Sequence, residues 1–238
     1  MYNTKILKEI NKFASQESFK TKILVYNRIL NLRKNYDPKL TYYKLQKYIK
    51  TCDINMYFSY GKKIIEDKKY KNIFEVSCEL ASNLIDNGSG REPSYNYLKK
   101  RICVEKTLFG YDYNSDPEWR PKYGVFDVYK KSGFSWGNYY GSAGYVKLPN
   151  HFKKHVTITL SDSLNRVNDT TVGTLKYFNH LLARLNDYHF DLLVGLANDE
   201  QINYKHGNQP EQYDNFIEAQ VHVKELLLDC HDIYTANS

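Results

Sequence analysis

Three polar side chains alternate along a predicted strand near the C-terminus and could form a catalytic face. Residues 215–223 favour a strand, and Glu218, Gln220 and His222 occupy every second position within it. Because successive side chains of a strand point to opposite faces, these three project together. The Glu218 carboxylate could stabilise a developing positive charge, while Gln220 or His222 orients an acceptor. The alternative is an edge strand whose polar face is solvated.

A second group of candidates could bind phosphates and sugar hydroxyls. Ser161 and Ser163 follow a Thr-rich predicted strand, and Ser142 lies in a stretch of small residues that a ligand could approach closely. Arg120 could pair with phosphate oxygens, because a guanidinium matches them in bidentate geometry. The alternatives are a core strand that ends in a turn and an exposed arginine before a proline.

Lys71 and Glu75 lie on another predicted strand, at residues 70–78. Lys71 could hold a phosphate as a point charge. Glu75 is either a second functional carboxylate or the ion partner of Lys71.

The histidines and cysteines lack the spacing of a metal site. His151 and His155 are four residues apart, but Pro149 and the strand-like residues after them argue against a shared helix face. The four cysteines are widely separated and contain no CxxC pair, so we expect free thiols at Cys52, Cys78, Cys103 and Cys230. We therefore expect no metal.

The elements that must position these residues divide into a helical third and a sheet-forming remainder. Helical spacing predicts helices over 4–14, 20–35 and 39–50, with breaks or caps at Ser15, Glu17 and Asp37. Further strands are predicted at 123–129, 143–148 and 155–160, and helices at 94–108 and 174–185. Without regular βαβ alternation the predicted fold class is α+β, with a helical subdomain at residues 1–69 packed on a mixed β-sheet domain at 70–238.

The positive charge is concentrated in the helical third. Residues 1–70 hold 16 Lys and Arg against 6 Asp and Glu, a balance of +10, whereas the remaining 168 residues hold 18 against 21, a balance of −3. Such a segment could contact nucleic acid, anionic lipid or an acidic protein face. The alternative is the Lys-, Asn- and Tyr-rich usage of an AT-rich genome. Because the basic residues are scattered along helix faces, we expect a protein partner rather than nucleic acid.

Neither a secretory signal nor a membrane span is predicted. The chain contains no run of 18 apolar residues, and its first residues alternate charge with aliphatic side chains. We expect a protein without a membrane partner. It would be cytoplasmic in its producer, or delivered into the cytosol of another cell without a cleaved signal peptide.

Four segments in a fixed order resemble a bacterial family long catalogued only as a domain of unknown function. Members of that family look related to effector enzymes that ADP-ribosylate a threonine of ubiquitin. The resemblance spans about residues 70–230 and omits the basic third. It rests on YKNIFE at 70–75, on LFG at 108–110 with RPKYG at 120–124, on the glycine and serine at 141–142 with TITLSDS at 157–163, and on IEAQVH at 217–222.

The resemblance implies an NAD-dependent mono-ADP-ribosyltransferase that modifies a protein side chain, with ubiquitin as one expected partner. The sheet domain would then have an ADP-ribosyltransferase-like fold, with NAD as substrate. The catalytic residues would be Glu218, Gln220 and His222, and the NAD site would be lined by Lys71, Glu75, Arg120, Ser142, Ser161 and Ser163.

The sequence departs from that superfamily at two positions. Many of its transferases carry Glu or Gln two residues before the catalytic Glu, where this chain has Phe216. That spacing would make Gln220 catalytic, but Glu218 is preferred because a neutral amide cannot supply anionic stabilisation. The superfamily also places an Arg on its first core strand, where this chain has Lys71.

Two rival functions come from these same features. The basic helical third and its tyrosines are compatible with a toxin or binding protein that targets nucleic acid. Lys71, at a position where Arg is commoner, is compatible with an interaction module that has lost catalysis.

Overall fold

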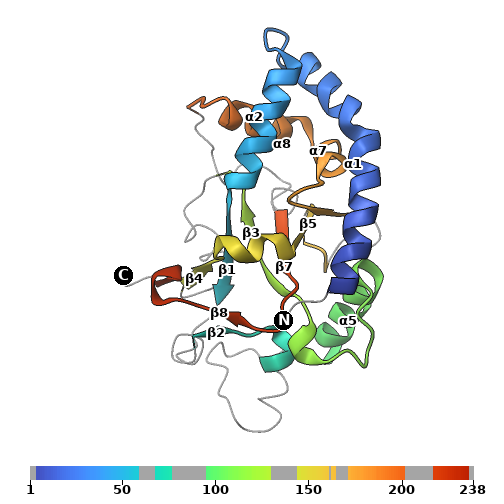
Figure 1. The fold of residues 1–238 in the computed structure, drawn as a ribbon, viewed down its shortest axis with the longest axis vertical. Coiled ribbons are helices and arrows are strands. Elements are labelled where there is room, and N and C mark those ends of the chain that lie inside the picture. Colours follow the sequence, from blue (N-terminus) through green and yellow to red (C-terminus); the bar gives the residue numbers. More distant parts are fainter. Residues whose placement is uncertain are drawn as a thin grey trace.

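A seven-stranded sheet forms the centre of a mixed α+β fold in the computed structural model (Figure 1). The structure describes residues 4–58, 68–76, 95–129, 144–160, 162–164, 171–201 and 217–235. The strand order is β6-β5-β7-β3-β1-β4-β9, and the described pairs are antiparallel. The α+β class is therefore confirmed, with antiparallel pairing where a mixed sheet was predicted.

Four of the strands lie where the sequence predicts them. These are β3 (Lys122–Asp127), β4 (Gly144–Lys147), β5 (Val156–Leu160) and β7 (Ile217–Val221). The sequence did not predict β1 (Asp53–Phe58), β6 (Val172–Thr174) or β9 (Ile233–Thr235). A separate two-stranded sheet pairs β2 (Lys69–Tyr70) with β8 (Leu226–Leu227).

The strand predicted at 70–78 is wrong over residues 73–76, which are helical. Asn72 determines this local structure, because its side-chain oxygen accepts hydrogen bonds from the backbone N–H groups of Phe74 and Glu75. An Asn side chain that bonds the following amides initiates a helical turn. Lys71 and Glu75 therefore do not share a strand.

Besides the helical residues 73–76, the described helices are α1 (Thr4–Leu32), α2 (Pro38–Thr51), α5 (Tyr95–Phe109), α7 (Asn179–Leu182) and α8 (Asp187–Ala197). Short 3₁₀ turns, η1 (Pro117–Trp119), η2 (Asn150–His155) and η3 (Cys230–Asp232), lie in the connections between elements. The helix predicted at 174–185 is reduced to α7, because Thr174 ends β6.

The predicted break near Ser15 and Glu17 is wrong, because α1 runs through both residues. Ser18 is buried there, and its side-chain and backbone oxygens accept hydrogen bonds from Asn179 of α7. These contacts fix the middle of α1 against the body of the protein. The predicted cap at Asp37 is confirmed, since its carboxylate accepts from the Leu40 amide.

The two faces of the sheet have opposite chemistry. One face presents apolar side chains such as Ile54, Phe126 and Ala219 to a core that includes Val25 and Ile29 of α1. The strand registers place Thr159 beside Glu218 and Thr157 beside Gln220 on the other face. Figure 1 shows α2, α7, α8 and the C-terminal half of α1 at one end, and α5 at the opposite end.

The N-terminal third is part of this same core. β1 lies between β3 and β4 in the sheet, so residues 1–69 are not a purely helical subdomain. Ion pairs to α8 join Arg28 of α1 to Asp187 at 2.7 Å and Arg33, the residue after α1, to Asp191 at 2.5 Å. Part of the basic charge of this third is therefore balanced by acidic residues from the remainder.

Candidate functional site

Glu218 is the second residue of β7, a strand that lies between β5 and β3 in the sheet. As predicted, Glu218 and Gln220 share one face of the strand, and His222 continues this face just beyond its end. The interpretation of this segment as a solvated edge strand is wrong, because Glu218 is only 4% exposed and Gln220 and His222 are fully buried. A buried carboxylate on a central strand requires polar partners.

Three donors hold one carboxylate oxygen of Glu218. Oε2 accepts from Gln220 Nε2 at 2.9 Å, from the Ser163 backbone N–H at 3.3 Å and from Thr159 Oγ1 at 3.4 Å. The other oxygen, Oε1, lies 3.9 Å from the Arg101 guanidinium. Burial raises the pKa of the Glu218 carboxyl above its usual value, while Arg101 and Ser163 oppose that shift.

A chain of hydrogen bonds runs along the polar face and ends on Glu218. Tyr111 Oη lies 3.1 Å from His222 Nδ1, and His222 Nε2 lies 2.8 Å from Thr157 Oγ1. Thr157 donates to Gln220 Oε1, and Gln220 donates to Glu218. Because Thr157 uses its proton toward Gln220, it accepts from His222, which assigns the Nε2–H tautomer. Every donor then points toward the carboxylate, and such chains polarise one another.

His222 is therefore a neutral link in this chain and not the acceptor-orienting residue that was predicted. Burial lowers the pKa of His222 to about 3. Its ring stacks on Tyr111 with an interplanar angle of 4° and contacts Phe109 edge-on. Both ring nitrogens are occupied, so no nitrogen is left to contact an acceptor.

Gly110 explains how Tyr111 reaches this histidine. The glycine has a φ of +79°, and the Tyr111 amide bonds back to the Glu105 carbonyl. The Gly110 amide bonds the Lys106 carbonyl, and a left-handed residue with this 5→1 hydrogen bond is the αL ending of a helix, for which glycine is favoured. The chain turns sharply after α5 and brings Tyr111 onto His222.

Arg101 is a site residue that the sequence analysis missed. It projects from α5, and its guanidinium carbon lies 4.1 Å from the centroid of the Tyr123 ring. It also bonds Ser163 Oγ at 3.4 Å and Tyr97 Oη at 3.3 Å. Its Nε is buried and has no hydrogen-bond partner in the described part of the chain. The four-residue spacing of Tyr97, Arg101 and Glu105 on a predicted helix was a signal that could have found it.

Arg120 belongs to a separate, closed ion pair. Its guanidinium lies 2.7 Å from Glu105, packs 4.3 Å from the Phe74 ring centroid and bonds the Asp112 carbonyl. The residue is 1% exposed, so it is neither the exposed arginine of the alternative interpretation nor a free phosphate ligand. The phosphate-binding role predicted for Arg120 has no support from this geometry.

Of the other residues predicted to bind NAD, one lies beside Glu218 and another forms ion pairs elsewhere. Ser163 contacts both Glu218 and Arg101. Glu75 instead pairs with Lys122 at 3.3 Å and Lys69 at 3.4 Å. Lys71, four residues before Glu75, is half-buried. Ser142 and Ser161 lie outside the described residues.

One trio of possible metal ligands is found in the described residues, and it lies on the surface. Asp229, His231 and Asp232 bring ligand atoms within 4.8 Å of one another. They lie around η3, apart from the polar face, and we assign them no role.

Comparisons with family models and with curated proteins give no match for this chain. Among the helices that the structure describes, none is both long enough and apolar enough to cross a membrane.

Proposed function

We propose that the chain is an NAD-dependent mono-ADP-ribosyltransferase in which Glu218 is the catalytic carboxylate. The observation that carries this proposal is the geometry of Glu218. It is buried on a central strand, it is held through one oxygen by Ser163, Thr159 and Gln220, and among the described residues Arg101 is its cationic neighbour.

The transfer breaks the bond between the ribose and nicotinamide, and positive charge develops on the ribose. A fixed carboxylate in a low-dielectric site stabilises such charge strongly. Gln220, Thr159 and Ser163 hold Glu218 in place, while the attraction of Arg101 favours the ionised form. Gln220 is thereby a positioning residue.

Arg101 takes over the phosphate-binding role that was predicted for Arg120. Its buried Nε has no partner among the described residues, and guanidinium groups bind phosphate oxygens with several donors at once. An anionic dinucleotide would supply that partner. Since Glu218 is 4% exposed, NAD reaches it only if the side chains that cover it move.

The acceptor is a protein side chain in this proposal, and the family resemblance makes a threonine of ubiquitin the first to test. A threonine hydroxyl must lose its proton as it attacks. Glu218 is the local base for this step, because the lowered pKa of His222, about 3, makes it a weak base and both its nitrogens are engaged.

Labelled NAD tests the proposal when it is incubated with purified ubiquitin and with cell lysate. The expected result is a labelled protein band with the wild-type chain and none with Glu218→Gln. Glu225→Gln is a matched control, because it makes the same change at an exposed position. Label on nucleic acid would support the nucleic-acid-targeting alternative. No label, together with no change in melting temperature in excess NAD, would favour the interaction module.

A further inference from the structure

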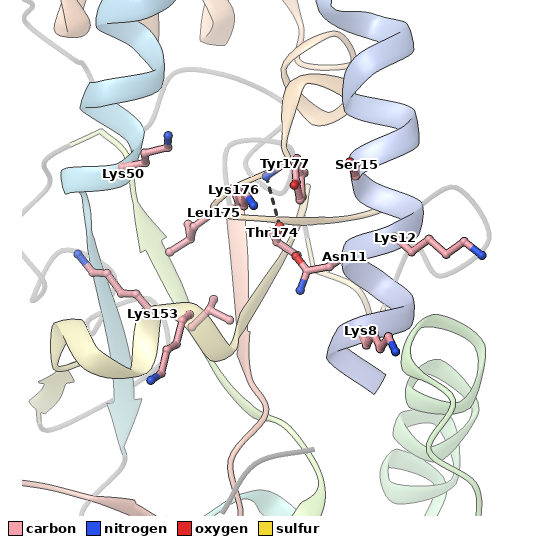
Figure 2. Close-up of a pocket in the computed structure, with 12 residues that line it drawn as sticks. Lys8, Asn11, Lys12, Ser15, Lys50, Lys153, Thr174, Leu175, Lys176 and Tyr177 are labelled. Carbon is pink, nitrogen blue, oxygen red and sulfur yellow. Dashed lines mark hydrogen bonds between the residues drawn. The ribbon is translucent and has the colours of Figure 1, made fainter. Parts of the chain in front are cut away.

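A lysine-rich cavity lies away from Glu218, between α1, η2 and the edge strand β6 (Figure 2). Its volume is about 710 Å³. Figure 2 shows the α1 residues on one side, Lys50 and Lys153 on the other, and Leu175, Lys176 and Tyr177 between them. The cavity is thus built from segments far apart in the sequence.

Half of the described lining residues are lysines. They are Lys8 and Lys12 of α1, Lys50 of α2, Lys153 and Lys154 of η2, and Lys176, which follows β6. No Asp or Glu is among the described residues that line it. Because like charges gathered around one hollow repel one another, an anion in the hollow would relieve that repulsion.

Polar groups suited to an anion lie among these lysines. Thr174 is buried, and its hydroxyl accepts a hydrogen bond from the Tyr177 amide at 3.2 Å. Asn11 and Ser15 line the α1 side. Lys153 is anchored at 2.9 Å to the Cys52 carbonyl, and burial lowers the pKa of its ammonium. A bound anion would favour the charged form of this half-buried lysine.

We propose that this cavity binds a compact, soluble ligand that carries several phosphate groups. The lysines come from four separate segments of the chain and line one concavity. Figure 2 shows Lys8 and Lys12 on one side of it and Lys50 and Lys153 on the other, an arrangement that favours a compact ligand over the continuous backbone of a nucleic acid. The proposal does not require transferase activity. In the sheet register, buried Thr157 on β5 lies between Thr174 and Gln220.

Calorimetry with inositol hexakisphosphate as the probe tests the proposal on the full chain. The cavity variant is Lys50→Gln, Lys154→Gln and Lys176→Gln, all exposed and from three different elements. The control variant makes the same change at exposed lysines outside the cavity, namely Lys39, Lys99 and Lys106. We expect saturable binding that the cavity variant weakens by about tenfold or more and that the control variant changes by less than about twofold.

Three results would overturn the proposal. The first is the absence of saturable binding, and the second is an equal loss in both variants, which would indicate non-specific attraction. The third is tighter binding of duplex DNA, or of vesicles containing phosphoinositide, than of the soluble probe at the same ionic strength. Glu218→Gln should leave probe binding unchanged, so failure of the proposed transferase function is distinguishable from failure of this site.

Discussion

The described part of the chain contains two buried pairs of glutamate and arginine, and the pairs differ in how completely their hydrogen-bonding groups are satisfied. In the first pair, Arg120 lies 2.7 Å from one oxygen of Glu105, and Tyr123 Oη donates to the other at 3.0 Å. In the second, Arg101 lies 3.9 Å from Glu218. Burial raises the pKa of both carboxyl groups, and in each the neighbouring arginine opposes the shift.

The number of short contacts in each pair indicates which pair could bind a ligand. Both oxygens of Glu105 are bound at short distance, which is the arrangement of a structural ion pair. Glu218 instead concentrates its short contacts on Oε2 and leaves Oε1 to a distant arginine. Arg101 also retains a buried N–H without a partner in the described residues. A buried group in that condition is costly unless it serves a ligand.

The largest expected effect is on stability, at the closed ion pair of Glu105 and Arg120. Glu105→Ala leaves Arg120 buried without its carboxylate and Tyr123 without its acceptor. Removal of one partner from a buried ion pair costs about 3–5 kcal/mol in unfolding free energy. Urea unfolding would measure this loss. A cost below about 1 kcal/mol, the value typical of exposed pairs, would show that the two pairs do not differ as argued.

The second largest expected effect is on activity, at the incompletely satisfied pair of Glu218 and Arg101. Glu218→Gln removes the negative charge but keeps the size, and should lower the transfer rate by about 100- to 1000-fold, or about 2.7–4 kcal/mol. The fold should persist, because a carboxyl group whose pKa is raised in the folded state gains no stability from ionising. Single-turnover kinetics and thermal melting measure the two effects. Activity within about threefold of wild type, or about 0.65 kcal/mol, would exclude Glu218 as the catalytic carboxylate.

The polar face could be predicted from the sequence, because the alternation of side chains along a strand depends only on neighbouring residues. The spacing of Glu218, Gln220 and His222 predicted their shared face, and the Gly110 turn lay within a motif already singled out. The sequence could not show that the Glu218 face is covered. Coverage depends on Arg101 and Tyr111, which reach it from α5 and the turn after it.

The predictions that were wrong failed because side-chain and tertiary contacts override the local sequence pattern. Lys71 and Glu75 were expected on a strand because their neighbours alternate, but the Asn72 side chain starts a helical turn there. Arg120 is typical of a phosphate ligand by residue type, yet Glu105, one turn beyond Arg101 on α5, already neutralises it. β1 is only six residues long and lies between long basic segments, so its place in the middle of the sheet is set by tertiary pairing.

The free energy of unfolding should also depend on pH through His222, which lies on the same polar face as Glu218. The pKa of His222 is lowered to about 3 from the usual 6.5, so between these values the unfolded chain binds a proton that the folded chain does not. Stability therefore falls as the pH falls through this window, by about 2 kcal/mol at pH 5. His222→Gln should remove this contribution.

The measurement is the change in unfolding free energy between pH 7 and pH 5, compared between wild type and variant. Because the glutamates titrate in both proteins, their contribution cancels in the difference. His231→Gln is the control, since it removes an exposed histidine. An unchanged pH dependence in His222→Gln would mean that His222 is not held neutral in the folded protein.

The smallest expected effect separates the two arginines directly. Arg101→Lys keeps the charge but loses the planar set of donors, so it should reduce transfer activity by about tenfold, or about 1.4 kcal/mol, with little change in melting temperature. Arg120→Lys makes the same substitution in the closed pair, where the short contact to Glu105 and the bond to the Asp112 carbonyl depend on guanidinium geometry. It should lower the melting temperature and leave the activity of the folded fraction unchanged. If both variants lost only stability, Arg101 would be a structural residue, and the phosphate contact assigned to it would need another donor.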